Sequence, residues 1–142
     1  MKKYVMVALL LAIIITACSR SELSRNNGID VDLSVLSSTM VFAEVFKMTS
    51  NPNDYAGKTV KAQGVYETYV HESGVRYHFI VMADAAACCA QGMELRKNSD
   101  RDNPDGYPER QTKIEVTGVY SSYTQSGALH YYLAIDDMVI LE

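Results

Sequence analysis

Two similar stretches decide the fold: VKAQGVYETY at residues 60–69 and IEVTGVYSSY at residues 114–123. They align at an offset of 54 residues and share Gly, Val, Tyr and Tyr at matching places. β-Branched and aromatic residues dominate both, as is typical of β-strands. At an offset of 53 the similarity continues through a Ser-Gly turn into a second apolar run, FIVM at 79–82 and YLAI at 132–135. Each copy therefore predicts a β-hairpin.

Gly64 and Gly118 lie midway along the first strands of these hairpins. A glycine inside a strand removes the side chain that would obstruct a sharp bend, which is how small barrels turn their corners. A further short strand fits residues 92–97, between the hairpins. Three strands, a connection and two more strands are the order of the OB-fold, a five-stranded Greek-key barrel. We therefore expect a mostly β fold, a small five-stranded OB-like Greek-key barrel over residues 53–142.

The chain also resembles OB-fold proteins of the bacterial envelope. The residues that carry this resemblance are YAGKTV at 55–60, leading into GVY at 64–66, and the second GVY at 118–120. The resemblance covers most of residues 53–142 and implies the same barrel. The connection at 98–111 is rich in Asp, Asn, Pro and Gly, which predicts a surface loop.

One α-helix is expected before the barrel, over residues 37–52. Ser37, Ser38 and Thr39 offer N-caps, and the residues after them place apolar side chains on one broad arc of a helix. Asn51 should end the helix, because a residue that precedes proline is pushed out of the α region.

The N-terminus has the features of an export signal. Two lysines precede a stretch of 14 uncharged residues, 4–17, which is shorter than the roughly 20 apolar residues that a transmembrane helix needs. ITAC at 15–18 resembles the signal of bacterial lipoproteins. That resemblance implies removal of residues 1–17 as a signal peptide and lipidation of Cys18 by a diacylglycerol and a fatty acyl chain such as palmitate. An ordinary secretory signal with an incidental cysteine is the alternative.

Residues 18–36 are predicted to hold the lipidated cysteine and a polar tether. Two or three acyl chains anchor a protein stably where one does not. In the lipoprotein family an Asp after the cysteine retains the protein at the inner membrane, so Ser19 favours the outer membrane if the cell has two. We expect an exported protein, lipid-anchored to the bacterial cell envelope.

The charge balance excludes some partners. Without residues 1–17, the remaining 125 residues carry 17 acidic and 11 basic side chains, a net charge of −6. Proteins that bind nucleic acid neutralise its phosphates with Lys and Arg, and no basic stripe is present, so we expect no nucleic-acid partner. The sequence also contains no nucleophile elbow, phosphate loop or His-Glu-x-x-His motif. We therefore expect no enzymatic activity.

The adjacent pair Cys88-Cys89 is the one chemically unusual feature. A disulfide between neighbours would be strained, because adjacent Cα atoms lie about 3.8 Å apart. Three uses stay open: a site for zinc or another soft metal, a redox-active pair, or packing of two small side chains. A zinc site would need further ligands, and both thiolates would have to lie in a turn to reach one ion. The candidate further ligands are Asp84, Glu94, His78 and His130.

The segment CCAQGMEL at 88–95 resembles a double-cysteine segment in uncharacterised envelope lipoproteins with an OB-like core. It is also similar to a segment in soluble domains attached to certain bacterial permeases. The resemblance implies that Cys88 and Cys89 form a site, with metal handling as its role.

Four tyrosines recur at corresponding places of the two copies: Tyr66 and Tyr69 in the first, Tyr120 and Tyr123 in the second. Since side chains alternate between the two faces of a strand, a spacing of three predicts that one tyrosine of each pair faces outward. Outward tyrosines could stack on a sugar or a base, or be the polar ends of core aromatics.

These features predict a membrane-anchored lipoprotein that acts as a binding module. The expected ligand is a soft metal such as zinc, held by the adjacent cysteines. The alternative is a protein-interaction or envelope-assembly module in which the cysteines only pack, with a protein partner that the sequence does not identify.

Overall fold

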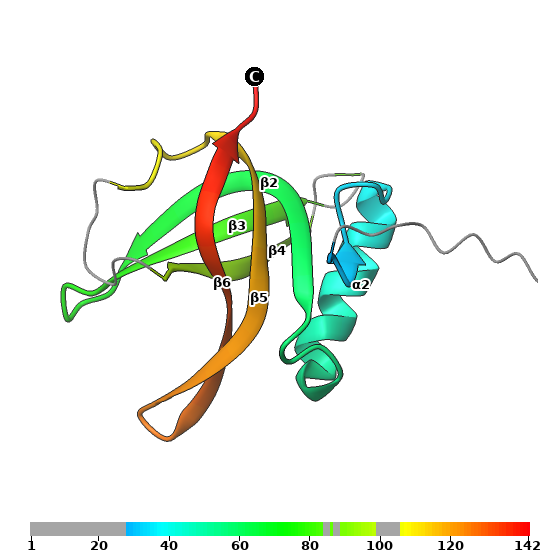
Figure 1. Cartoon of the computed structure of the whole chain (residues 1–142). Helices are drawn as coiled ribbons and strands as arrows, with labels where there is room; N and C mark the ends of the chain where they lie inside the picture. Colours follow the sequence, from blue (N-terminus) through cyan, green and yellow to red (C-terminus); the bar gives the residue numbers. More distant parts are fainter. Residues whose placement is uncertain (1–27, 84–85, 87–88, 99–105) are drawn as a thin grey trace, which may run out of the picture.

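The computed structural model describes residues 28–83, 86, 89–98 and 106–142, and it is mostly β with one α-helix (Figure 1). A two-residue strand and the helix come first, and five longer strands follow. The elements are β1 (Val31–Asp32), α2 (Ser38–Ser50), the 3-10 helix η1 (Pro52–Asp54), β2 (Thr59–Val70), β3 (Arg76–Ala83), β4 (Ala90–Lys97), β5 (Lys113–Gln125) and β6 (Ala128–Ile140).

The strands form one six-stranded sheet in the order β1-β2-β3-β4-β6-β5, with an additional pairing between β2 and β5. The five strands β2 to β6 therefore follow one another in a closed cycle of pairings. Only β1–β2 and β4–β6 are parallel among the pairs of described strands. Both predicted hairpins are present, as β2–β3 and β5–β6, and the predicted short strand at 92–97 is the core of β4.

The predicted count of five strands was wrong, because the structure has six. The extra strand is β1, which pairs with Val60 and Lys61 of β2 and lies within residues 18–36, the range assigned to the tether. Two residues are too few to produce an alternating pattern, so the sequence carries no strand signal there. Just after β1, Leu33 is buried to 2% exposure.

Helix α2 ends where the sequence predicts, with Asn51 as its C-cap and Pro52 opening η1. Its buried side chains are Val41, Val45 and Met48, which belong to the same core cluster as the inward side chains of the sheet. Figure 1 shows α2 beside the strongly curved part of β2.

The curvature of the sheet depends on Gly64 and Gly118. A Cβ atom at Gly64 would lie 2.6 Å from the carbonyl oxygen of Val81, and one at Gly118 would lie 2.7 Å from that of Ala134. Both obstructing atoms belong to backbone, which cannot rotate away. At the next residue, Val65, strand β2 pairs with both Lys113 of β5 and Val81 of β3. Glycine therefore allows β2 to pass from one partner strand to the other.

The predicted division of the four tyrosines is confirmed. Tyr66 and Tyr120 are buried at 3% and 2% exposure, whereas Tyr69 is 56% exposed and Tyr123 is partly exposed. One tyrosine of each copy thus contributes to the core and the other faces outward.

No helix in the described ranges has both the length and the apolar character needed to cross a bilayer. The predicted export signal at 1–17 and the predicted lipid site at Cys18 lie outside the described residues.

We predict that Gly64→Ala or Gly118→Ala lowers the free energy of unfolding by about 1–3 kcal/mol, the usual cost of forcing extra atoms into a packed site. Urea denaturation followed by circular dichroism measures this. Gly92→Ala is the matched control, because its new Cβ would meet nothing closer than 3.8 Å. Equal stability of all three variants would show that the bends do not need glycine.

Candidate functional site

Strand β4 separates two sets of side chains. Met93 and Leu95 point into the core at 4% and 1% exposure, so Glu94 and Arg96 point to the opposite, outer face. Cross-strand partners share a face: Glu94 pairs with Tyr132 of β6, and Tyr123 of β5 pairs with His130 of β6. We call this set the outer aromatic face. Its members are Tyr77, Glu94, Arg96, Tyr123, Gln125, His130 and Tyr132.

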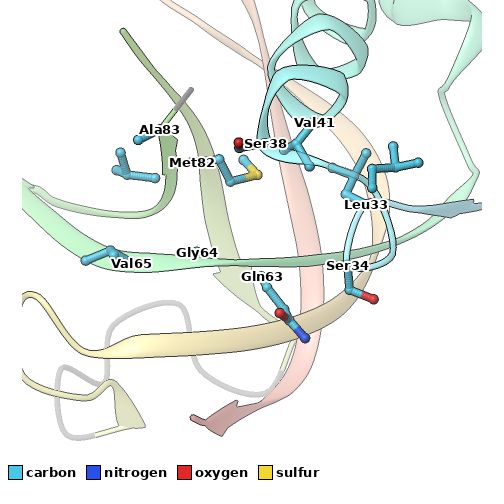
Figure 2. A pocket seen from close by; sticks show the side chains of 11 residues that line it. Leu33, Ser34, Ser38, Val41, Gln63, Gly64, Val65, Met82 and Ala83 are labelled. Atoms are coloured by element: carbon cyan, nitrogen blue, oxygen red, sulfur yellow. The ribbon is translucent and has the colours of Figure 1, made fainter. Parts of the chain in front are cut away.

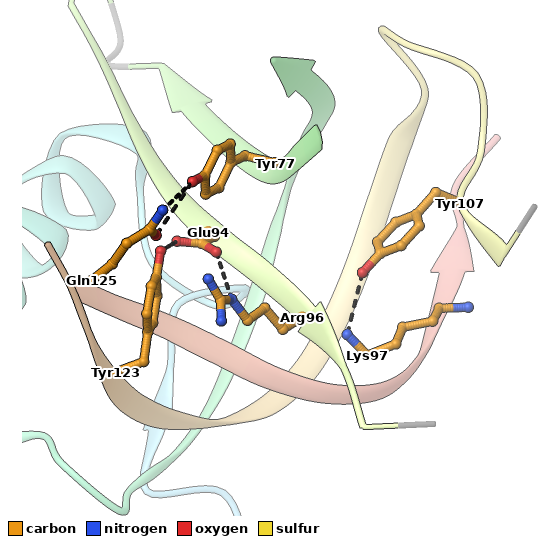
Figure 3. Close-up of polar contacts among 7 residues, drawn as sticks. All are labelled: Tyr77, Glu94, Arg96, Lys97, Tyr107, Tyr123 and Gln125. Carbon is orange, nitrogen blue, oxygen red and sulfur yellow. Dashed lines mark hydrogen bonds and ion pairs between the residues drawn. The ribbon is translucent and has the colours of Figure 1, made fainter. Parts of the chain in front are cut away.

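Glu94 is the centre of this face and is only 9% exposed. The hydroxyl of Tyr123 donates a hydrogen bond of 2.9 Å to Oε2 of Glu94, and Nε of Arg96 donates one of 2.6 Å to Oε1 (Figure 3). Both carboxylate oxygens therefore have a donor. Hydrogen bonds to a charged acceptor are about twice as strong as neutral ones, so these contacts fix the positions of Tyr123 and Arg96.

Arg96 lies against two aromatic rings. Its guanidinium carbon is 3.5 Å from the ring centre of Tyr123 and 5.1 Å from that of Tyr132, within the range of cation–π attraction. The ring of His130 stacks on Tyr123 at 5.1 Å between centres. Four side chains from three strands thus form one packed layer on the outside of the sheet.

A second polar contact lies on the same face. The hydroxyl of Tyr77 donates to Oε1 of Gln125 at 3.3 Å, and Nε2 of Gln125 lies 2.9 Å from that hydroxyl (Figure 3). Tyr77 belongs to β3 and Gln125 to the end of β5, so the contact joins the two hairpins across the outer aromatic face.

The electrostatics keep the hydroxyl of Tyr123 protonated. Burial, together with the hydrogen bond to Glu94, raises the pKa of Tyr123 to about 12, so its hydroxyl remains a donor at neutral pH. Arg96 balances the charge of Glu94. Among the described residues, Arg96 has no hydrogen-bond partner beyond Glu94, so its two terminal Nη groups keep their N–H donors for other ligands.

An aromatic stack lies on the inner side of β3. His78 pairs with Leu95 and so points inward. Its ring stacks on Tyr107 at 3.6 Å between centres, and its Nδ1 lies 2.5 Å from the hydroxyl of Tyr66. Burial, and after it the charge of Arg76, lowers the pKa of His78 to about 4. His78 is therefore neutral at physiological pH.

The structure places two of the predicted metal ligands, His78 and Glu94, far from Cys89. His78 and Glu94 point to opposite faces of the sheet, and both lie four to five residues along their strands from the Ala83–Ala90 pair beside Cys89. At about 3.3 Å per residue their backbones lie roughly 13 Å or more from that pair. Two ligand atoms bound to one zinc ion lie within about 4.6 Å of each other, because each Zn–ligand bond is about 2.0–2.3 Å long.

Cys89 itself is exposed, just before β4. His130 lies on the outer face against Tyr123. Asp84 and Cys88 lie outside the described residues. Within the described ranges, no three His, Cys, Asp or Glu side chains come close enough to hold a metal ion.

A pocket of about 260 Å³ lies between the β1–α2 connection, the start of α2, the middle of β2 and the end of β3 (Figure 2). Its lining is mostly apolar, and Ser34, Ser38 and Gln63 are its polar residues. Its lining residues are Leu33, Ser34, Leu36, Ser38, Val41, Gln63, Gly64, Val65, Val81, Met82 and Ala83.

Sequence reasoning missed Arg96, Tyr77, Gln125 and Tyr132 as parts of one site. Alternation along β4 would have placed Glu94 and Arg96 on one face. Their contact with Tyr123 depends on the parallel register of β4 with β6, where Glu94 pairs with Tyr132. No local pattern encodes that register.

We predict that His78 makes the fold less stable as the pH falls from about 6.5 to about 4. In this window the unfolded chain binds a proton at residue 78 and the folded chain, with a pKa of about 4, does not, so acid favours unfolding. His78→Gln should flatten the dependence of the unfolding free energy on pH, measured by urea denaturation at several pH values. The exposed turn residue His71 provides the control, as His71→Gln. Identical slopes for wild type and His78→Gln would contradict the prediction.

No known protein-family profile matches the chain, and no curated protein matches it. Function must therefore be inferred from the fold and its side chains.

Proposed function

We propose that the protein is a non-catalytic binding module of the bacterial cell envelope, anchored by lipid on Cys18, and that it binds its ligand at the outer aromatic face. The observation that carries this proposal is the burial of Glu94 on the outside of the sheet, between Tyr123 and Arg96. Removing an ion pair from water costs several kcal/mol of free energy per ion. Apolar side chains of similar size stabilise a fold without that desolvation cost. The network of Glu94, Tyr123 and Arg96 lies outside the apolar core, and a role in ligand binding accounts for its presence there.

We further propose that β2 to β6 form the OB-like Greek-key barrel, with β1 as an added strand. The order of hydrogen-bonded strands supports this proposal. Neighbouring strands pair in the order β2-β3-β4-β6-β5, β5 pairs again with β2, and β4 and β6 are parallel. OB-folds bind oligonucleotides and oligosaccharides on the face of their second and third strands, between two hairpin loops. The corresponding strands here are β3 and β4, which carry Tyr77, Glu94 and Arg96.

The ligand class is a glycan. Phosphate polymers are disfavoured by the net charge of −6 that remains after residues 1–17 are removed. A sugar ring has an apolar side that packs on aromatic rings, here Tyr132 and His130, and hydroxyl groups that accept N–H donors. The Nη groups of Arg96 and the amide of Gln125 supply such donors on the same face.

The test is titration of the protein with soluble amino-sugar oligosaccharides of the bacterial cell-wall type, followed by NMR. We expect saturable shifts confined to the outer aromatic face. Gln125→Ala should weaken binding about fivefold, the loss expected for one hydrogen bond of about 1 kcal/mol.

Gln63→Ala is the matched control for this titration. Gln63 is also an exposed glutamine with a side-chain hydrogen bond, to Glu115 on another part of the sheet, and its replacement should leave the affinity unchanged. Equal losses of affinity in both variants, or the absence of any glycan-induced chemical-shift change, would contradict a glycan site. Chemical-shift changes on this face that only a protein partner produces would support the alternative of a protein-interaction module.

A zinc-binding role for Cys88 and Cys89 is the second candidate. The observation that favours it is the position of Cys89, which is exposed and lies in the connection between β3 and β4 rather than inside a strand. A turn is the arrangement that would let neighbouring thiolates reach one ion. His78 and Glu94 are too far along their strands to assist, so any further ligands come from elsewhere.

For this candidate we predict one zinc per chain, with affinity that rises with pH because thiols must lose their protons before they bind metal. Competition with a chromophoric chelator measures the affinity in the presence of reductant. Replacing both cysteines by Ala should abolish binding, whereas His78→Gln should leave it unchanged. Zinc binding that survives loss of both cysteines would exclude this role.

A further inference from the structure

Helix α2 carries apolar side chains on the side that faces away from the core. Its buried stripe is Val41, Val45 and Met48. At 100° per residue, Met40, Ala43 and Phe46 fall on a different side of the helix, and Met40 and Phe46 are 56% and 58% exposed. A surface helix normally presents polar residues there. Thr39, Lys47 and Ser50 lie on the same side and are also exposed. This side therefore mixes apolar and polar groups, as does a helix that rests at a membrane interface.

The helix has few charges to oppose such a contact. Its charged residues are Glu44 and Lys47, and Glu44 accepts a hydrogen bond of 2.5 Å from the hydroxyl of Tyr55. Residues 34–59 as a whole have two acidic and two basic side chains, so the net charge of −6 comes from the rest of the chain after residue 17. Lys47 and Lys58 both lie close to the ring centre of Tyr55, at 5.9 and 4.9 Å. Lys47 also lies 3.9 Å from a carboxylate oxygen of Glu44. This stretch of the chain is therefore electrically neutral as a whole, so an anionic bilayer does not repel it.

The described part of the chain begins at Gly28, ten residues before the first residue of α2. Nine residues, 19–27, separate Cys18 from Gly28 and span at most about 32 Å when fully extended. After Gly28 the chain enters β1, and only five residues lie between β1 and α2. Leu33, in that short connection, lines the same pocket as Val41 of α2 (Figure 2). A lipid on Cys18 would thus hold α2 near the bilayer.

We infer that the outward side of α2, carried by Met40 and Phe46, rests on the membrane that holds the lipid anchor. The inference builds on the proposed anchoring at Cys18 and names the surface of the domain that meets the bilayer. The lipid anchor holds the domain at the bilayer surface at a high effective concentration. A few apolar side chains at the interface are then enough to keep α2 in contact with the membrane. The outer aromatic face, which belongs to β3 to β6, then stays available for ligand.

The sequence contains no tryptophan, so Phe46→Trp introduces a single reporter at the proposed contact. The chain from Cys18 to Glu142, with Cys88 and Cys89 replaced by Ala, is coupled through Cys18 to maleimide-bearing lipid in vesicles of phosphatidylethanolamine and phosphatidylglycerol. Leu129→Trp is the matched control, because Leu129 is 55% exposed and lies near the tip of the β5–β6 hairpin, away from α2 (Figure 1).

We expect brominated acyl chains to quench the fluorescence of the Phe46→Trp variant at least about twofold more than that of the Leu129→Trp variant, because only the interfacial side chain reaches the acyl region. A further Met40→Glu substitution should remove this difference. Equal quenching of the two reporters would overturn the inference, as would self-association of the chain through α2 in sedimentation measurements.

The chemical tether makes this result independent of natural lipidation. That step is tested separately by fractionating cells that express the wild-type chain or Cys18→Ala. Loss of Cys18→Ala from the membrane fraction supports the proposed anchor. Unchanged fractionation would refute the anchor without altering the vesicle result.

Discussion

The fold depends on sharp bends in strands β2 and β5. Each bend lies at a glycine, Gly64 in β2 and Gly118 in β5. At Gly64 and Gly118 the backbone of a neighbouring strand lies so close that a Cβ would come within 2.7 Å of a carbonyl oxygen. Each glycine weakens its strand intrinsically, but the bend lets β2 pair with β5 along one half and with β3 along the other. The cycle of pairings closes through this change of partner. Closure in turn sets the parallel register of β4 with β6.

That register creates the outer aromatic face. It places Tyr132 beside Glu94, and the long antiparallel pairing of β5 with β6 then brings Tyr123 to the same side. The result is a charged pair that is shielded from water on the outside of the sheet, with Arg96 stacked on Tyr123. Such a layer adds rigidity and directs unused N–H donors outward. The proposed binding role rests on these outward donors, because apolar side chains can stabilise a fold without a buried ion pair.

The two sides of the molecule have different characters. Helix α2 covers one side with Val41, Val45 and Met48 turned inward and presents Met40 and Phe46 outward. The outer aromatic face lies on β3, β4, β5 and β6 and includes no side chain of that helix. The proposed lipid anchor and the proposed ligand site assign a separate role to each of these surfaces. In this account, the helix meets the membrane and the sheet meets the ligand.

Local patterns predicted the secondary structure well and the site poorly. The repeated Gly-Val-Tyr stretches indicated both hairpins, and capping residues with Pro52 indicated the helix, because these signals are carried by neighbouring residues. Strand β1 was missed because two residues carry no period. The sequence suggests Glu94 as a metal ligand, because it is a carboxylate close to two cysteines. Its contacts with Tyr123 and Arg96 arise from pairings between segments that are distant in sequence.

The most direct test of the central claim is the pairing at Val65, measured by nuclear Overhauser effects between backbone protons. The account predicts contacts from the neighbourhood of Val65 to both Lys113 of β5 and Val81 of β3 in one folded species. Contacts to Val81 alone, with β5 paired only to β6, would show an open sheet. In that case neither the register of β4 with β6 nor the outer aromatic face could be maintained as described.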